Sequence, residues 1–81
     1  MITADQIRAA RALVRWSARV LGEMSGVSLP TIQRMESANG VPTGLSKNLE
    51  AIERALEKAG VEFIDENGGG PGVRLKHRAR T

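Results

Sequence analysis

Apolar residues recur at helical spacing near the start of the chain, three and four positions apart, and form one stripe: Ile7, Ala10, Leu13 and Val14. Thr3 and Gln6 have the spacing of a capping box, in which each side chain bonds the backbone of the other residue. A helix is therefore predicted to begin at Ala4. Three arginines fall outside the stripe and are predicted to form a solvated basic face: Arg8, Arg11 and Arg15.

Two shorter helices are predicted next. Ser17 can cap a helix whose apolar positions are Val20, Leu21 and Met24, and which ends near Ser25 and Gly26. Ser28 can cap the following helix, where Pro30 falls in the first turn and its missing N–H breaks no intrahelical bond. Gly22 gives a small contact between the two helices, whose shared apolar seam is predicted to be Leu21, Val27, Ile32 and Met35.

The second half of the chain changes from helical to alternating periodicity. Residues 38–47 are rich in turn residues and predict a loop. A fourth helix, ended by Gly60, is indicated by Leu49, Ile52, Leu56 and Ala59. Residues 61–65 and 73–77 then alternate between apolar and polar side chains, so they predict two strands joined by the glycine-rich stretch ENGGGPG.

Composition narrows the function classes. The 81 residues carry a net charge of +3, which mildly favours an anionic partner. No cysteine is present and His77 is the sole histidine, so a disulfide framework and a Cys/His zinc site are excluded. The N-terminus lacks the basic and apolar regions of a secretory signal, and no apolar run approaches the roughly 20 residues of a membrane span. We expect a soluble, cytoplasmic protein without membrane association.

The sequence gives little indication of a catalytic site. The serines have no His/Asp arrangement beside them, and the carboxylates Glu50, Glu53 and Glu57 at helical spacing are explained by a charged outer face. The NGGGPG stretch lacks the GK[ST] ending of a phosphate-binding loop. We therefore expect no enzyme, no cofactor and no metal. Trp16 is predicted to pack at a helix junction.

Residues 16–37, WSARVLGEMSGVSLPTIQRMES, resemble the helix-turn-helix of the XRE family, the phage-repressor and Cro type. IRAARALVRW before them and NLEAIERALEKAGVEF after them resemble the family's flanking helices. The resemblance implies a mainly α, four- to five-helix, lambda-repressor-like helix-turn-helix domain with a short C-terminal β-hairpin. It divides the chain into a DNA-binding domain over residues 1–60, with the motif at about 17–37, a hairpin over 61–77 and a basic tail over 78–81.

The same resemblance implies that the third helix enters the major groove of double-stranded DNA. The base-reading positions then fall on Leu29, Pro30, Thr31, Gln33 and Arg34. Among them, Arg34 can donate two hydrogen bonds to guanine and Gln33 can pair with adenine. Phosphate contacts are assigned to Ser17, Arg19, Ser28, Asn39, Thr43, Ser46 and Lys47.

A hairpin of two strands is marginal alone, so its edges are predicted to form a homodimer contact through Val61, Phe63, Val73 and Leu75. The resulting hypothesis is a sequence-specific, dimeric repressor of transcription that binds a pseudo-palindromic site. One alternative stays open from the sequence. It is a protein-interaction module of the antitoxin type, in which the hairpin and the tail bind a protein partner and DNA binding is secondary.

Overall fold

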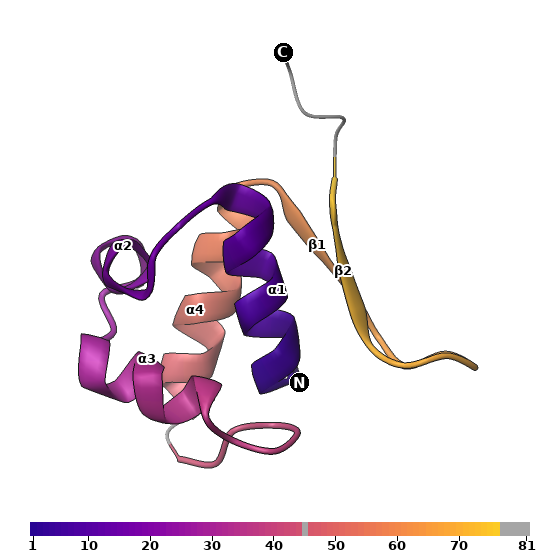
Figure 1. The fold of residues 1–81 in the computed structure, drawn as a ribbon, viewed down its shortest axis with the longest axis horizontal. Helices are drawn as coiled ribbons and strands as arrows, with labels where there is room; N and C mark the ends of the chain where they lie inside the picture. The colour runs from indigo at the N-terminus through magenta and orange to yellow at the C-terminus, as the bar shows by residue number, and fades with distance from the viewer. Residues whose placement is uncertain (45, 77–81) are drawn as a thin grey trace.

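The computed structural model describes residues 1–44 and 46–76. Within them the helices are α1 (Ala4–Val14), α2 (Ala18–Ser25), α3 (Leu29–Glu36) and α4 (Ser46–Lys58), followed by the strands β1 (Val61–Ile64) and β2 (Gly72–Leu75). Figure 1 shows α1 and α4 at the centre, with α2 and α3 on one side and the hairpin on the other. The predicted mainly helical fold with a small antiparallel hairpin is confirmed.

The helix boundaries follow the predicted capping residues. The Gln6 backbone N–H donates to the Thr3 hydroxyl over 3.1 Å, and the Thr3 N–H donates to the Gln6 side-chain oxygen over 2.8 Å. Ser17 caps α2 by accepting from the Val20 N–H, and Gly26 ends α2 at φ 77°, in the left-handed region that favours glycine. The capping box, the start at Ala4 and the end of α2 are confirmed, because each depends on residues close in sequence.

One hydrophobic core lies between the helices and β1. Its fully buried large side chains are Ile7, Leu21, Ile32, Ile52, Leu56 and Val61. Half-buried Trp16 packs against this core, as predicted. Two other apolar predictions are wrong, since Leu13 is 38% exposed and Met24 is 60% exposed.

The positions of these two residues explain their exposure. Leu13 lies about 120° around α1 from Ile7 at roughly 100° per residue, which is the margin of the apolar stripe. Met24 is in the last turn of α2, a helix whose buried side chain is Leu21. A helix of 8 residues contacts the core along one narrow face, so apolar side chains outside that face remain partly exposed to water.

The hairpin is attached to α1 through one buried amide. The Gln6 side-chain nitrogen donates to the carbonyls of Ile64 and Gly72, over 3.2 and 3.0 Å, at the far end of the two strands. β1 ends at Ile64, one residue before the predicted end, whereas β2 begins at Gly72, one residue before the predicted start, and ends at Leu75. Ser46 and Lys47 belong to α4 instead of the preceding loop. The predicted strand end at His77 and the tail 78–81 lie outside the described residues.

Candidate nucleic-acid interface

Helix α3 presents a continuous outer surface. Ile32 and Met35 are buried on its inner side, whereas Pro30, Gln33 and Arg34 are exposed. Of the five residues assigned to base reading, the remaining two are half-buried: Leu29 and Thr31. The structure therefore brings all five to one short helix, with its two best hydrogen-bonding side chains in solvent.

The start of α3 differs from the prediction. Ser28 occupies the predicted cap position with an extended backbone, but its side chain makes no capping bond. Its hydroxyl instead donates to the Thr31 hydroxyl oxygen over 2.9 Å. In a cap the Ser28 oxygen would accept a hydrogen bond from a backbone N–H, whereas here the hydroxyl donates to a neighbouring side chain. The backbone N–H groups in the first turn of α3 are thus left without a serine cap.

A close approach of backbones joins α2 to α3. A Cβ atom placed on Gly22 would lie 2.9 Å from the Val27 carbonyl oxygen, which is shorter than real Cβ contacts. Glycine is therefore required where α2 passes the turn before α3. This confirms the predicted small contact at Gly22.

The other end of α3 is held by α1. The Arg11 guanidinium donates to both carboxylate oxygens of Glu36, over 2.7 and 2.9 Å, and to the Trp16 carbonyl over 3.0 Å. Arg8 donates to the Glu36 backbone carbonyl and to the Asp5 carboxylate. The last residue of α3 is consequently fixed through both its side chain and its backbone.

This contact corrects the predicted solvated basic face of α1. The Arg11 side chain is only 23% exposed and the Glu36 side chain 11% exposed. The hydrogen bond to Glu36 raises the pKa of Arg11 and outweighs the opposing effect of burial. Sequence periodicity placed Arg11 outside the apolar stripe correctly but carried no signal of a partner 25 residues away.

Seven residues were predicted to contact phosphates, and all of them are exposed: Ser17, Arg19, Ser28, Asn39, Thr43, Ser46 and Lys47. Ser28 immediately precedes α3, and Thr43 also lies close to the outer surface of that helix. Thr43 lines a hollow of about 340 Å³ together with Thr31, Arg34 and Asn48. Asn48 is a half-buried polar residue that the sequence did not single out, and it joins the candidate interface because α4 starts beside α3.

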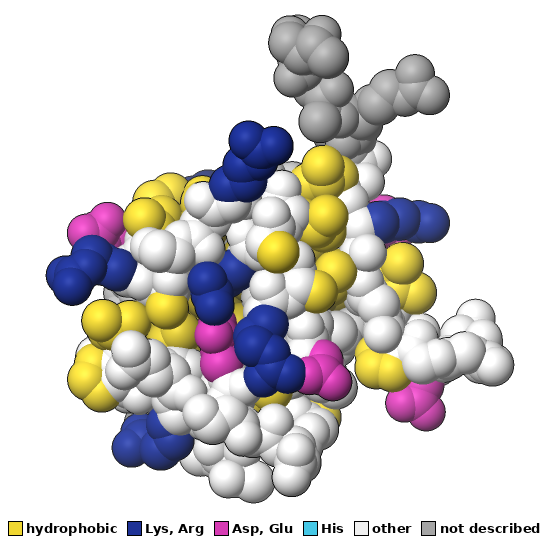
Figure 2. All heavy atoms as spheres, viewed as in Figure 1, with side chains coloured by type: hydrophobic (Ala, Val, Ile, Leu, Met, Phe, Trp, Pro, Cys, Tyr) yellow, Lys and Arg dark blue, Asp and Glu magenta, His cyan; other side chains and the backbone are white. Residues whose placement is uncertain are grey.

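Charge is spread over the molecule. Figure 2 shows basic side chains on several parts of one face, with acidic side chains among them at its centre. The ion pairs of the described residues are Arg8–Asp5, Arg11–Glu36 and Arg74–Glu62. Arg19, Arg34 and Lys47 belong to none of these pairs, so their charges are available to an anion.

The four predicted dimer residues differ in accessibility. Val61 is 2% exposed and belongs to the core of the single chain. Phe63, Val73 and Leu75 are half-buried and keep some surface for a partner. A contact at the hairpin would therefore use the Val61 backbone and not its side chain.

The sequence matches no protein-family model, and no curated protein matches it. Within residues 1–44 and 46–76, no helix has the length and apolar character needed to cross a membrane. The same residues contain no group of three or more His, Cys, Asp or Glu side chains placed to hold a metal ion.

Proposed function

We propose that this protein is a sequence-specific double-stranded DNA-binding regulator of transcription, with α2 and α3 as a helix-turn-helix of the XRE type. In this function α3 lies in the major groove, α2 crosses the DNA backbone, and a homodimer represses by occupying a pseudo-palindromic promoter site. Two α3 helices would address half-sites about 34 Å apart, one turn of the duplex.

The observation that carries the proposal is the exposed surface of α3 on a firmly held helix. A helix of 8 residues is about 12 Å long, which is comparable to the roughly 12 Å width of the major groove. Its start is packed against α2 through Gly22, and its end is bonded to Arg8 and Arg11. Rigid placement matters because base reading requires donors at fixed positions in the groove.

The roles within the site follow from side-chain chemistry. Arg34 is assigned to guanine and Gln33 to adenine, while Leu29 and Pro30 offer apolar contact to a thymine methyl. Thr31, whose hydroxyl already accepts from Ser28, can still donate one hydrogen bond. Thr43 beside Arg34 supports a phosphate contact close to the base-reading residues.

The proposal is tested by selection of binding sites from random duplex DNA at about 150 mM salt, with the wild-type protein and Arg34→Ala in parallel. We expect the wild type to enrich one two-fold symmetric site, and Arg34→Ala to lose the preference at one base position per half-site. Arg54→Ala, which removes an exposed arginine from α4, is the matched control and should enrich the wild-type site.

Two results would count against the function. Failure of the wild type to enrich any sequence, with binding that vanishes as salt rises, would leave only phosphate attraction. Enrichment of the same site by Arg34→Ala would place base reading elsewhere than on α3.

A further inference from the structure

The two strands of the hairpin have free edges whose backbone groups can be assigned from the ladder. The Lys76 N–H donates to the Gly60 carbonyl over 2.7 Å, so these opposite residues form a hydrogen-bonded pair. Opposite residues of an antiparallel ladder alternate between bonded and non-bonded pairs. Val61 opposite Leu75 and Phe63 opposite Val73 are therefore non-bonded pairs, and their N–H and C=O groups point away from the hairpin.

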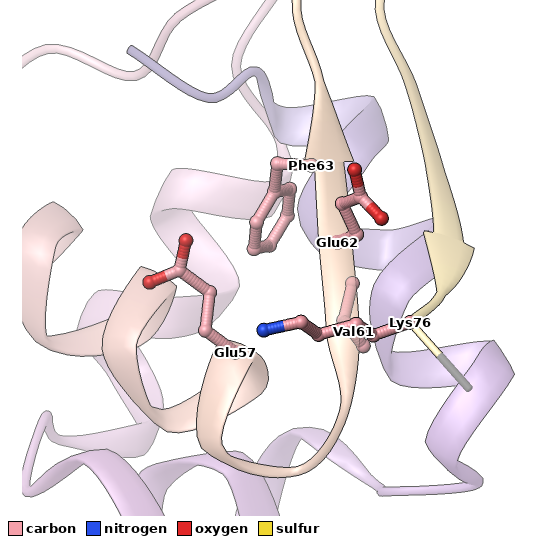
Figure 3. A pocket seen from close by; sticks show the side chains of 5 residues that line it. All are labelled: Glu57, Val61, Glu62, Phe63 and Lys76. Carbon is pink, nitrogen blue, oxygen red and sulfur yellow. The ribbon is translucent and has the colours of Figure 1, made fainter.

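The edge of β1 borders a hollow of about 420 Å³, which is lined by Glu57, Val61, Glu62, Phe63 and Lys76. Figure 3 shows the Phe63 ring beside this hollow and the Lys76 side chain extending across β1 toward it. Ile64, the next residue of β1, is 36% exposed and lies on the opposite face of the hairpin. The hollow thus combines an open strand edge, the aromatic ring of Phe63 and the long, positively charged side chain of Lys76.

We infer that a second copy of this chain docks on the edge of β1, so that two β1 strands pair antiparallel about Phe63 and form a four-stranded sheet. The pairing uses the outward backbone groups of Val61 and Phe63 in each copy. It places the two Phe63 side chains next to each other across the two-fold axis, where each covers part of the other's hollow. The inference deepens the proposed function, since a dimeric regulator needs such a contact.

The register of this pairing also brings residues of opposite charge from the two copies to the same end of the interface. With Phe63 opposite Phe63, the position of Gly60 lies opposite residue 66 of the other copy. Lys76 is the ladder partner of Gly60, and Figure 3 shows its side chain extending across β1 to the side of Glu57. In this pairing Glu66 of the second copy, two residues beyond the end of β1, comes to the same end of the interface, so we expect it to meet the Lys76 ammonium. The two-fold axis repeats this contact, and a self-complementary surface is what an isologous dimer requires.

The β2 edge is less suited to pairing. Its outward positions continue from Val73 to residue 71, which is a proline and has no N–H to donate. The side chains of β2 next to that edge are also smaller than Phe63. We therefore place the second copy of the chain on the edge of β1 and not on the edge of β2.

The test is sedimentation equilibrium of the free protein from about 1 to 200 µM, without DNA. We expect the wild type to form dimers, and Lys76→Glu and Glu66→Lys each to weaken dimerisation at least fivefold. An equimolar mixture of the two variants should dimerise about as well as the wild type, because both cross-axis contacts then join opposite charges. Lys58→Glu is an exposed change of equal charge on the side of α4 that borders Trp16 and Met24, outside the hollow at β1, and should dimerise like the wild type.

Three results would overturn the inference. They are a wild type that stays monomeric at 200 µM, a mixture no better than either variant alone, and equal weakening by Lys58→Glu. A monomer would point to a different protein as the occupant of the hollow. Because the measurement contains no DNA, its failure leaves base reading by Arg34 to be judged separately on a single half-site.

Discussion

Replacing Arg11 with methionine tests whether α1 fixes the end of α3. The substitution keeps the aliphatic stem of the side chain but removes two hydrogen bonds to Glu36 and one to the Trp16 carbonyl. It also leaves the Glu36 carboxylate without its main partner, at 11% side-chain exposure. Both losses destabilise the folded state.

The size of the effect follows from the partial burial of the pair. Exposed ion pairs contribute about 0 to 1 kcal/mol, whereas removing one partner of a fully buried pair costs about 3 to 5 kcal/mol. Side chains that are 23% and 11% exposed lie between these limits, so we expect Arg11→Met to lower the free energy of unfolding by about 2 kcal/mol. Glu36→Gln keeps one acceptor oxygen and should cost about 1 kcal/mol.

The assay is urea unfolding followed by the fluorescence of Trp16, the sole tryptophan. With a slope near 1 kcal/mol per molar urea for a domain of this size, Arg11→Met should lower the midpoint by about 2 M. The double variant Arg11→Met/Glu36→Gln should cost less than the sum of the single variants by about 1 kcal/mol. Arg15→Met, at the C-terminal cap of the same helix, is the control and should change stability by less than about 0.5 kcal/mol.

The reasoning would be refuted if Arg11→Met stayed within about 0.5 kcal/mol of the wild type, or if the two single costs simply added. Either result would mean that the contact forms at no net gain over water. The anchoring of α3 would then have to come from Gly22 and the buried side chains alone.

Two further stability predictions follow from single positions. Gly22→Ala should cost about 1 to 3 kcal/mol in chemical unfolding, since its Cβ would lie 2.9 Å from the Val27 carbonyl, while Gly69→Ala, with no atom within 4 Å, should be near neutral. Burial and the charge of Glu57 raise the pKa of Glu53, so its ionisation costs stability as pH rises through that pKa. Glu53→Gln should therefore raise stability by about 0.2 to 0.5 kcal/mol at pH 7 and leave it unchanged near pH 3, as compared by thermal unfolding; a gain of equal size at both pH values would contradict this.

Local features of the sequence predicted local structure. Thr3 and Gln6 predicted the start of α1, Ser17 and Gly26 the bounds of α2, and Gly22 the close contact with the turn before α3. Each of these depends on residues a few positions apart, so the chemistry is visible in a short window. The same holds for the outward direction of Gln33 and Arg34, which follows from helical spacing.

Contacts between distant segments could not be predicted in this way. Gln6 also bonds the carbonyls of Ile64 and Gly72, 58 and 66 residues away, and Arg11 bonds Glu36. Nothing in the residues around Gln6 or Arg11 specifies those partners, because they depend on how the helices and the hairpin pack. The same limit applies to Asn48, which joins the hollow beside Arg34 only through the placement of α4.

Discrimination between a selected DNA site and its scrambled version, with and without Arg34, tests the central claim most directly. By fluorescence anisotropy at about 150 mM salt, Arg34→Ala should weaken binding to the selected site by about 1 to 3 kcal/mol, and should have little effect on the scrambled duplex. Lys47→Ala, assigned to a phosphate, should weaken both duplexes about equally. An equal loss on both duplexes for Arg34→Ala would contradict base reading by α3.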